Sequence, residues 1–343
     1  MKNTTNHNVL LRGQNMLPRL WKTALATVLC AAAQLALAQA PPASVLRIDT
    51  ASVVAYNEDT GDVSSFATDP GIPTPVQHKD FVRQIVIADI QAVNGQPVMG
   101  VHTRVGPYVL LVTSPTPGLA IADVARNAVV EIAFEILKSD GTPIGTIMAS
   151  GFAGGPPPPG SPSNVTQNNY VVTGGTGAFF GARGQVGAQA PGIPTRNTSM
   201  REDPANRRQH GGGTQRWVIH LIPMESPEIA AITHSGDFSL VTASKPATAG
   251  EILSLFARGL GPVNPGVDPG QPFPSSPLAA VNSPVQVTVN GKPADVLGAV
   301  GYPGAVDGYQ VNFRVPPDTA KGVATIQVSA AWILGAPVSI PVQ

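Results

Sequence analysis

The chain has 343 residues, of which 43% are hydrophobic, only 12% are charged, and 71 are glycine or proline (36 and 35). This charge content is about half of the roughly 25% found in ordinary globular proteins, and the glycine and proline content is typical of turn-rich β structure. Equal numbers of basic and acidic residues, 21 of each, argue against a nucleic-acid-binding surface. The length favours two domains over one.

The N-terminus has the pattern of a secretory signal. Residues 1–22 are basic and polar, residues 23–37 are apolar, and Ala36-Leu37-Ala38 is a small-residue cleavage motif. We therefore predict cleavage after Ala38 and a secreted, periplasmic or cell-surface location. An uncleaved membrane anchor remains the alternative, although the apolar stretch is short for a membrane span. The single cysteine, Cys30, lies in this leader, so the mature chain has no thiol for a disulfide or a metal site.

The segment 39–226 shows β-strand patterns separated by turn signals. Residues 128–137 alternate, with Val130, Ile132, Phe134 and Ile136 on one face, which predicts a half-buried strand. Further strands are predicted at 45–56, 81–90, 98–103, 108–113, 143–149, 170–173, 178–186 and 216–222. Asn94-Gly95 predicts a tight hairpin between two of them, and the polar stretch 187–213 predicts a long functional or mobile loop.

Residues 227–249 are predicted to be a connection, and a second β domain is predicted at 250–343. Its strands are expected at 251–257, 285–289, 294–300, 309–315, 324–330 and 338–342. Asn290-Gly291 predicts a hairpin turn within it. Strands at this spacing over about a hundred residues favour an immunoglobulin-like sandwich.

A glycine-rich stretch from Tyr170 to Val186 stands out from the strand patterns. Gly174 and Gly175 suggest positive φ in a tight turn, and Gly181 and Gly184 suggest a bulge or close approach of the backbone. A phosphate-binding glycine loop is the rival interpretation, but neither a lysine nor a helical pattern follows the glycines.

This stretch resembles the signature of dirigent proteins and allene oxide cyclases. The matching residues are Gly174, Gly175, Thr176, Gly177, Phe179, Ala182 and Gly184. The resemblance extends over about residues 45–223 and implies an eight-stranded antiparallel β-barrel with a mostly apolar cavity. It also implies a small apolar ligand and, by analogy, a homo-oligomer. Only the glycine-rich stretch matches closely, so no catalytic residue of either group is carried over.

The C-terminal part, about residues 244–343, resembles an immunoglobulin-like module of exported bacterial proteins. The matching segments are 250–256, 259–263, 284–294 and 309–316. The resemblance implies a role as a spacer or in presentation at the cell surface, with no activity of its own.

Three polar residues within the barrel strands are candidate ligand-binding residues: Asp89, Arg104 and Arg183. The alternative for each is a solvent-facing or ion-paired position on the outside of the barrel. Glu131 and Glu135 lie opposite the apolar stripe of their strand, so we expect them to face water rather than to form an acid–base pair. His220 is expected to be an ordinary histidine of the closing strand. The scattered histidines lack metal-ligand spacing, and no metal or other cofactor is predicted.

Two functions follow as hypotheses. In the first, the barrel binds a small molecule or a cell-surface component, and the immunoglobulin-like module presents it. In the second, the barrel acts as a dirigent- or cyclase-type enzyme or stereochemical guide on a small apolar substrate. A deep apolar pocket lined by at least two of Asp89, Arg104 and Arg183 would favour the second hypothesis, and a barrel filled by large side chains would oppose it.

Overall fold

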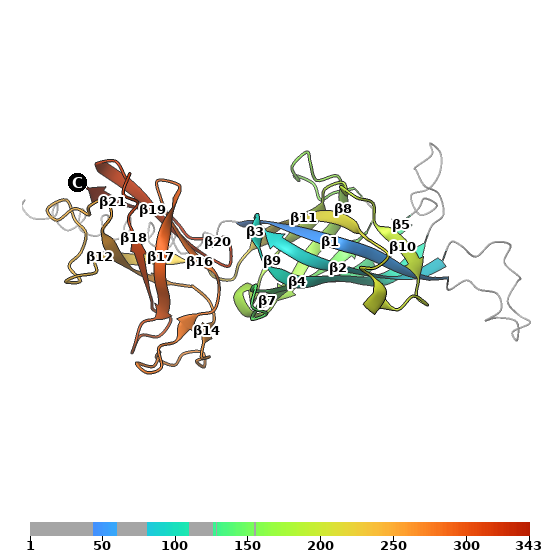
Figure 1. The fold of residues 1–343 in the computed structure, drawn as a ribbon, viewed down its shortest axis with the longest axis horizontal. Coiled ribbons are helices and arrows are strands. Elements are labelled where there is room, and N and C mark those ends of the chain that lie inside the picture. Colours follow the sequence, from blue (N-terminus) through green and yellow to red (C-terminus); the bar gives the residue numbers. More distant parts are fainter. Residues whose placement is uncertain (1–43, 60–80, 110–125, 128, 154–155) are drawn as a thin grey trace, which may run out of the picture. The chain divides into compact units, whose positions relative to one another are not determined.

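A computed structural model describes residues 44–59, 81–109, 126–127, 129–153 and 156–343 (Figure 1). The predicted signal segment therefore lies outside the described residues. The described part is built of β-strands with only short 3₁₀ turns, so the all-β prediction is confirmed. Two sheets account for it, and each is described by itself.

Eight antiparallel strands form a closed barrel, as predicted. They are β1 (Ser44–Asp59), β2 (Phe81–Val93), β4 (Met99–Val109), β6 (Val129–Leu137), β7 (Pro143–Phe152), β8 (Gln167–Gly175), β9 (Arg183–Ala188) and β11 (Gly213–Ile222). Each pairs with the next, and β1 pairs with β11 along one edge and with β2 along the other (Figure 1). This double pairing leaves no free edge in the cylinder. Short strands β3 (Gln96–Pro97) and β5 (Arg126–Asn127) extend it.

The hairpin between β2 and β3 shows the predicted turn chemistry. Asn94 and Gly95 have φ of 51° and 79°. Positive φ at both central positions matches the right-handed twist of the flanking strands, and this pair of residues tolerates it best. Asn290 and Gly291 repeat the pattern in the second sheet, with φ of 51° and 77°. Both hairpin predictions are confirmed.

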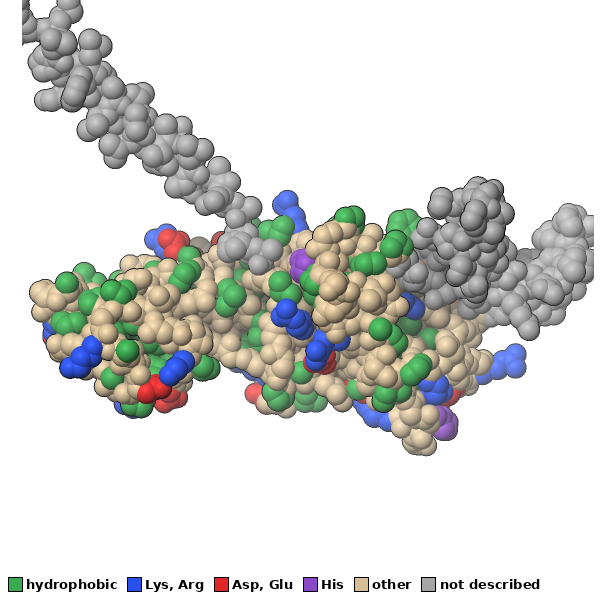
Figure 2. Space-filling view, turned by 90° about the horizontal axis from the view of Figure 1, so that it is seen from above, with side chains coloured by type: hydrophobic (Ala, Val, Ile, Leu, Met, Phe, Trp, Pro, Cys, Tyr) green, Lys and Arg blue, Asp and Glu red, His purple; other side chains and the backbone are tan. Residues whose placement is uncertain are grey.

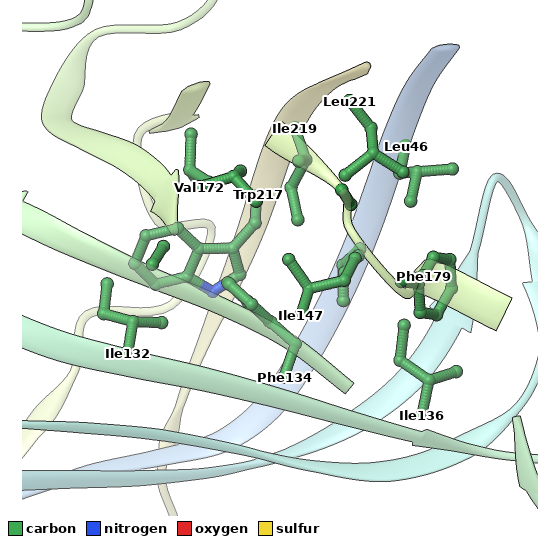
Figure 3. Close-up of a cluster of buried hydrophobic side chains, with 14 of the residues drawn as sticks. Leu46, Ile132, Phe134, Ile136, Ile147, Val172, Phe179, Trp217, Ile219 and Leu221 are labelled. Atoms are coloured by element: carbon green, nitrogen blue, oxygen red, sulfur yellow. The ribbon is translucent and has the colours of Figure 1, made fainter. Parts of the chain in front are cut away.

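The alternation along β6 sends its apolar side chains into the barrel. Val130, Ile132, Phe134 and Ile136 are all at most 2% exposed, whereas Glu131 and Glu135 lie on the outside in contact with solvent. Inward-facing side chains of the other strands meet them and fill the lumen (Figure 3). Those labelled in the figure are Leu46, Ile147, Val172, Phe179, Trp217, Ile219 and Leu221.

A bulge in β1 changes which of its residues face inward. The register against β11 shifts between Thr50 and Val53, so β1 carries one extra residue there, and Ser52 has φ of 51°. Before the bulge the buried inward residues include Leu46, Ile48 and Thr50, at even positions. After it, Val53 and Ala55, at odd positions, line the lumen. One inserted residue in a strand exchanges its two faces.

The glycine-rich stretch differs from the sequence-based expectation. Gly174 and Gly175 end β8 and do not have positive φ; the positive values belong to Gly177 (60°), Gly181 (68°) and Gly184 (141°). Residues Gly177–Phe179 form a 3₁₀ turn, η3, instead of continuing a strand, and β9 begins only at Arg183. A Cβ on Gly184 would lie 1.9 Å from the His220 carbonyl oxygen, so the predicted close approach is confirmed there.

The predicted long loop before β11 is partly ordered into regular structure. It contains β10 (Arg196–Ser199), which pairs in parallel with residues 54–57 of β1, and a 3₁₀ turn, η4 (Pro204–Asn206). Arg196 donates two hydrogen bonds to Glu202, at 2.8 and 2.7 Å. Hydrogen bonds from Arg196 and Thr198 are the main reason that the pKa of Glu202 falls to about 2. This segment is therefore held by its own ion pair and by its pairing with the edge of β1.

The second sheet is a curled set of ten strands. They are β12 (Glu228–His234), β13 (Ile252–Arg258), β14 (Val263–Asn264), β15 (Ala280–Val281), β16 (Val285–Val289), β17 (Lys292–Gly301), β18 (Tyr309–Arg314), β19 (Gly322–Ala330), β20 (Ile333–Leu334) and β21 (Val338–Val342). β12 pairs with β13, so residues 228–234 belong to this sheet and not to a connection. The sequence missed this strand because its Ala-Ala pair interrupts the alternation. The finer assignment, an immunoglobulin-like sandwich, stays a prediction.

The two neighbouring glycines at the end of β8 make a matched test of the packing around η3. A Cβ on Gly175 would lie 2.4 Å from the Phe179 carbonyl oxygen and 2.6 Å from that of Thr146, whereas a Cβ on Gly174 meets nothing within 4 Å. Because overpacking typically costs about 1–3 kcal/mol, we expect Gly175→Ala to lower the free energy of unfolding by that amount. Gly174→Ala should change it little. Urea denaturation followed by circular dichroism measures both, and equal effects would contradict this packing.

Candidate ligand site in the barrel lumen

A cavity of about 320 Å³ occupies the lumen beside the C-terminal half of β1 and the start of β11. Its lining comes from β1, β2, β4, β8, β10 and β11 and from the segment before β10. The lining residues are Val53, Ala55, Gln84, Val86, His102, Arg104, Gln167, Asn168, Pro191, Pro194, Thr195, Asn197, Gln215 and Trp217. The volume lies at the lower end of the range usual for small-molecule sites.

Aromatic rings separate this cavity from the apolar part of the lumen. His102 stacks on Phe134, with ring centroids 4.7 Å apart and an interplanar angle of 22°. Trp217 tilts against His102 at 4.8 Å and meets the edge of Phe134 at 5.6 Å. Tyr170 lies 6.1 Å from Trp217 on the far side. We call His102, Phe134 and Trp217 the aromatic floor, since the lumen beyond them is filled (Figure 3).

The floor holds three buried nitrogen atoms without a well-formed hydrogen bond. Among the described residues, no partner of ordinary geometry reaches Nε1 of Trp217 or either ring nitrogen of His102, and the backbone of Ala133 makes only a weak contact with the imidazole. Each such atom costs roughly 1–3 kcal/mol. Most buried polar atoms in proteins are paired, so an exception calls for a water, a ligand or another functional reason. Three such atoms at one place make the floor the candidate ligand site.

Burial keeps His102 neutral. The side chain is 1% exposed, and its burial, reinforced by the positive charge of Arg104, lowers the pKa of His102 to about 3. The backbone of Ala133 offsets this only slightly. At neutral pH the imidazole therefore offers one N–H donor and one acceptor nitrogen, and it contributes no charge to the cavity.

A chain of polar side chains crosses the wall of the cavity. Arg104 on β4 donates to the amide oxygen of Gln84 on β2. Gln84 donates from Nε2 to Asn57 Oδ1 at 2.8 Å, and Asn57 donates to the Ala55 carbonyl at 3.2 Å. Neighbouring strands thus fix the orientation of each side chain. In this series of hydrogen bonds Arg104 uses one of its five N–H donors.

Two glutamines form the opposite wall. Gln215 on β11 donates from Nε2 to the Gln189 carbonyl, and Gln167 on β8 donates to that carbonyl at 3.3 Å and to Gln215 Oε1 at 3.4 Å. The main chain of Gln215 is held in turn by the Thr50 hydroxyl at 2.9 Å. The wall is therefore polar, anchored to backbone and uncharged.

Of the three candidate ligand-binding residues, the structure places only Arg104 in the cavity. Asp89 lies on the outer face of β2, where it accepts hydrogen bonds from Arg207 and, at 2.7 and 3.0 Å, from Arg208. Burial alone would raise the pKa of Asp89, but hydrogen bonds from Arg208 and Arg207 outweigh it and hold the pKa below its usual value. Arg183 is exposed at the start of β9. Neither of these two lines the cavity.

The other residues considered from sequence also lie away from the cavity. Glu131 and Glu135 face solvent as expected, and His220 lies on the outside of β11, 3.4 Å from the Gln185 amide. The signature residues Gly174, Gly175, Thr176, Gly177, Phe179 and Gly184 are absent from the lining. They instead bring Phe179 into the apolar core, with a Thr146–Thr176 hydroxyl contact of 2.7 Å beside it.

Sequence reasoning missed His102, Trp217, Gln84 and Gln215 as site residues. A signal for His102 was present: Gly100, His102, Arg104 and Gly106 alternate along β4, so the two polar side chains share one face with two glycines. A Cβ on Gly106 would clash with Val130 inside the barrel, which identifies that face as the inner one. The alternation alone does not show which face of β4 is the inner one; the contacts with the neighbouring strands do.

The described part of the chain offers neither a metal site nor a membrane-spanning helix. No group of three or more His, Cys, Asp or Glu residues within it is placed to hold a metal ion. None of its helices has the length and apolar character to cross a bilayer. On the face in Figure 2 the lysine and arginine side chains are dispersed, several of them beside acids, rather than gathered in one patch.

Comparisons with known proteins do not assign a family. No protein-family model matches the chain, and no curated protein matches it significantly. Among solved structures, a polysaccharide lyase aligns with 88% of this chain at 10% identity and a TM-score of 0.18. The alignment spans 40% of that protein. A similarity this low carries no inference about fold or function.

The buried imidazole predicts a specific pH dependence of stability. The pKa of His102 in the folded state, about 3, lies below the value of about 6.5 in unfolded chains. The unfolded chain therefore binds the proton first, so stability present above pH 6.5 is lost as the pH falls toward 3. Between pH 7 and pH 5 this loss is about 2 kcal/mol. We expect His102→Leu to remove it, as measured by urea unfolding at the two pH values.

The control is His220→Gln, which removes a histidine on the outer face of the barrel. It should leave the difference between pH 7 and pH 5 as large as in the wild type. If His102→Leu retained the full difference, the imidazole would not be buried and neutral as described.

Proposed function

We propose that this protein is an exported small-molecule-binding protein whose ligand occupies the barrel cavity. The observation that carries the proposal is the aromatic floor, where three nitrogen atoms of His102 and Trp217 are buried without a well-formed hydrogen bond at the base of a cavity of about 320 Å³. A site that pre-forms unpaired donors and acceptors loses stability when empty and regains it when a ligand supplies the missing bonds.

The chemistry of the lining favours a polar ligand over the apolar one implied by the family resemblance. Nine of the lining side chains carry hydrogen-bonding groups: Gln84, His102, Arg104, Gln167, Asn168, Thr195, Asn197, Gln215 and Trp217. The apolar part of the lumen, where an apolar substrate would lie, is filled by fully buried side chains such as Leu46, Ile136 and Phe179. Binding is therefore supported better than the dirigent- or cyclase-type alternative.

The rest of the proposal concerns how the barrel is delivered and displayed. We infer that residues 1–38 are a cleaved signal peptide and that the glycine-rich stretch relates the barrel to dirigent proteins and allene oxide cyclases. We further infer that the second sheet is an immunoglobulin-like module that presents the barrel. Its separate apolar core, which includes Leu253, Val311, Phe313 and Ile326, supports a structural role of this kind.

Ligand binding can be tested by blocking the cavity at its rim. Asn197 is exposed and lines the cavity, whereas Ser199 is exposed on the same strand and does not line it. A library of low-molecular-weight neutral, anionic and cationic sugars and aromatic compounds should contain compounds that raise the midpoint of thermal unfolding. At 100 times Kd the stabilisation is about 2.7 kcal/mol, which corresponds to roughly 4 °C in a protein of this size.

Asn197→Trp should abolish these shifts, and Ser199→Trp should preserve them. If the same compounds stabilised Asn197→Trp as strongly as the wild type, they would bind outside this cavity. If no compound of the library stabilised the wild type or Ser199→Trp, the proposal would lose its basis.

A further inference from the structure

The cavity carries one positive charge, on Arg104, that no acid among the described residues neutralises. Arg104 donates to Gln84 and, within the described part of the chain, makes no ion pair. Three other arginines of the barrel and its loops are paired with acids: Arg83 with Glu58, Arg216 with Asp49, and Arg207 with Asp89. A guanidinium in a low-dielectric cavity without a counter-charge is an anion-binding group, and its planar donors match a carboxylate in a two-bond geometry.

From this arrangement we propose that the ligand is a compact, hydroxylated carboxylate, of the size of one sugar-acid ring, whose carboxylate pairs with Arg104. The inference rests on the proposed binding function and names the ligand class. Three further observations support it: the neutral floor, the amide walls and the filled lumen.

Because the floor is neutral, Arg104 is the only charged group in the described lining that can distinguish between ligands. Burial and the charge of Arg104 depress the pKa of His102, so the imidazole stays uncharged. No aspartate or glutamate belongs to the described lining, which removes any group that would attract a cation. Electrostatic complementarity therefore favours a single negative charge on the ligand.

The walls are suited to hydroxyl groups. Gln84, Gln167, Asn168, Asn197 and Gln215 line the cavity, and each side-chain amide both donates and accepts hydrogen bonds. A ligand hydroxyl likewise donates and accepts, so it can join a wall already orientated by its own hydrogen bonds. A site built of such groups discriminates strongly against analogues that lack the hydroxyls, because its polar groups then stay unpaired.

The floor and the filled lumen limit the ligand's length. Trp217, Val53, Ala55 and Val86 supply apolar surface against which the face of a ring can lie. Beyond Trp217 the lumen is packed, with Ile219 and Ile147 fully buried (Figure 3). A long acyl chain has no room there, whereas a single hydroxylated ring fits the space above the floor.

Titration calorimetry of the full chain with a matched probe series tests the proposal. D-glucuronate, D-glucose and D-glucosamine share one ring and differ in charge, and benzoate carries the carboxylate without hydroxyls. We expect D-glucuronate to bind with a millimolar or tighter Kd and at least tenfold more tightly than the other three. Arg104→Gln should remove this preference, and Arg104→Lys should retain part of it because the charge remains.

Arg83→Gln is the matched control, since Arg83 lies on the outside of the barrel. It should leave D-glucuronate binding unchanged, and each variant is checked for folding by circular dichroism. Equal binding of D-glucose or D-glucosamine, or D-glucuronate binding that survives Arg104→Gln, would overturn the role of Arg104. Equal binding of benzoate would overturn the requirement for hydroxyls. If none of the four binds while library compounds still stabilise the protein, this inference fails and the proposed function stands.

Discussion

The double pairing of β1 is the constraint on which the rest of the barrel depends. Its residues bond to β11 on one edge and to β2 on the other, so the sheet closes and every strand acquires an inside and an outside. Closure also fixes the distance across the lumen, because an eight-stranded barrel is just wide enough for side chains to fill it or for one small ligand. One part of the lumen is filled by side chains, and the other contains the cavity.

In one part the inward side chains are large and aliphatic or aromatic, and they pack without space for a guest. In the other they are shorter or polar, and the His102, Phe134 and Trp217 rings mark the border. The filled part stabilises the fold by burying apolar surface, which offsets the cost of the unpaired nitrogen atoms in the floor. A packed core next to a cavity with unsatisfied polar atoms is consistent with the proposed binding function.

The sequence predicted the elements better than the site. Alternation in residues 130–136 and the two Asn-Gly pairs gave strands and turns correctly, because these signals are local. The glycine-rich stretch pointed to a barrel, but it was taken to bear on function, whereas its glycines pack Phe179 into the core. Asp89 was a reasonable candidate until Arg207 and Arg208, over a hundred residues away, proved to pair with it. Pairings of that kind depend on tertiary structure.

The bulge at Ser52 determines the capacity of the barrel. If β1 continued past Thr50 as a regular strand with the same sequence, its inward positions would stay even, and Val54 and Tyr56 would face inward in place of Val53 and Ala55. The phenol ring of Tyr56, now buried against the outside of the wall, would then occupy the space where a guest is proposed to lie. The extra residue therefore keeps a large aromatic ring out of the lumen and lines the cavity with the smaller side chains of Val53 and Ala55.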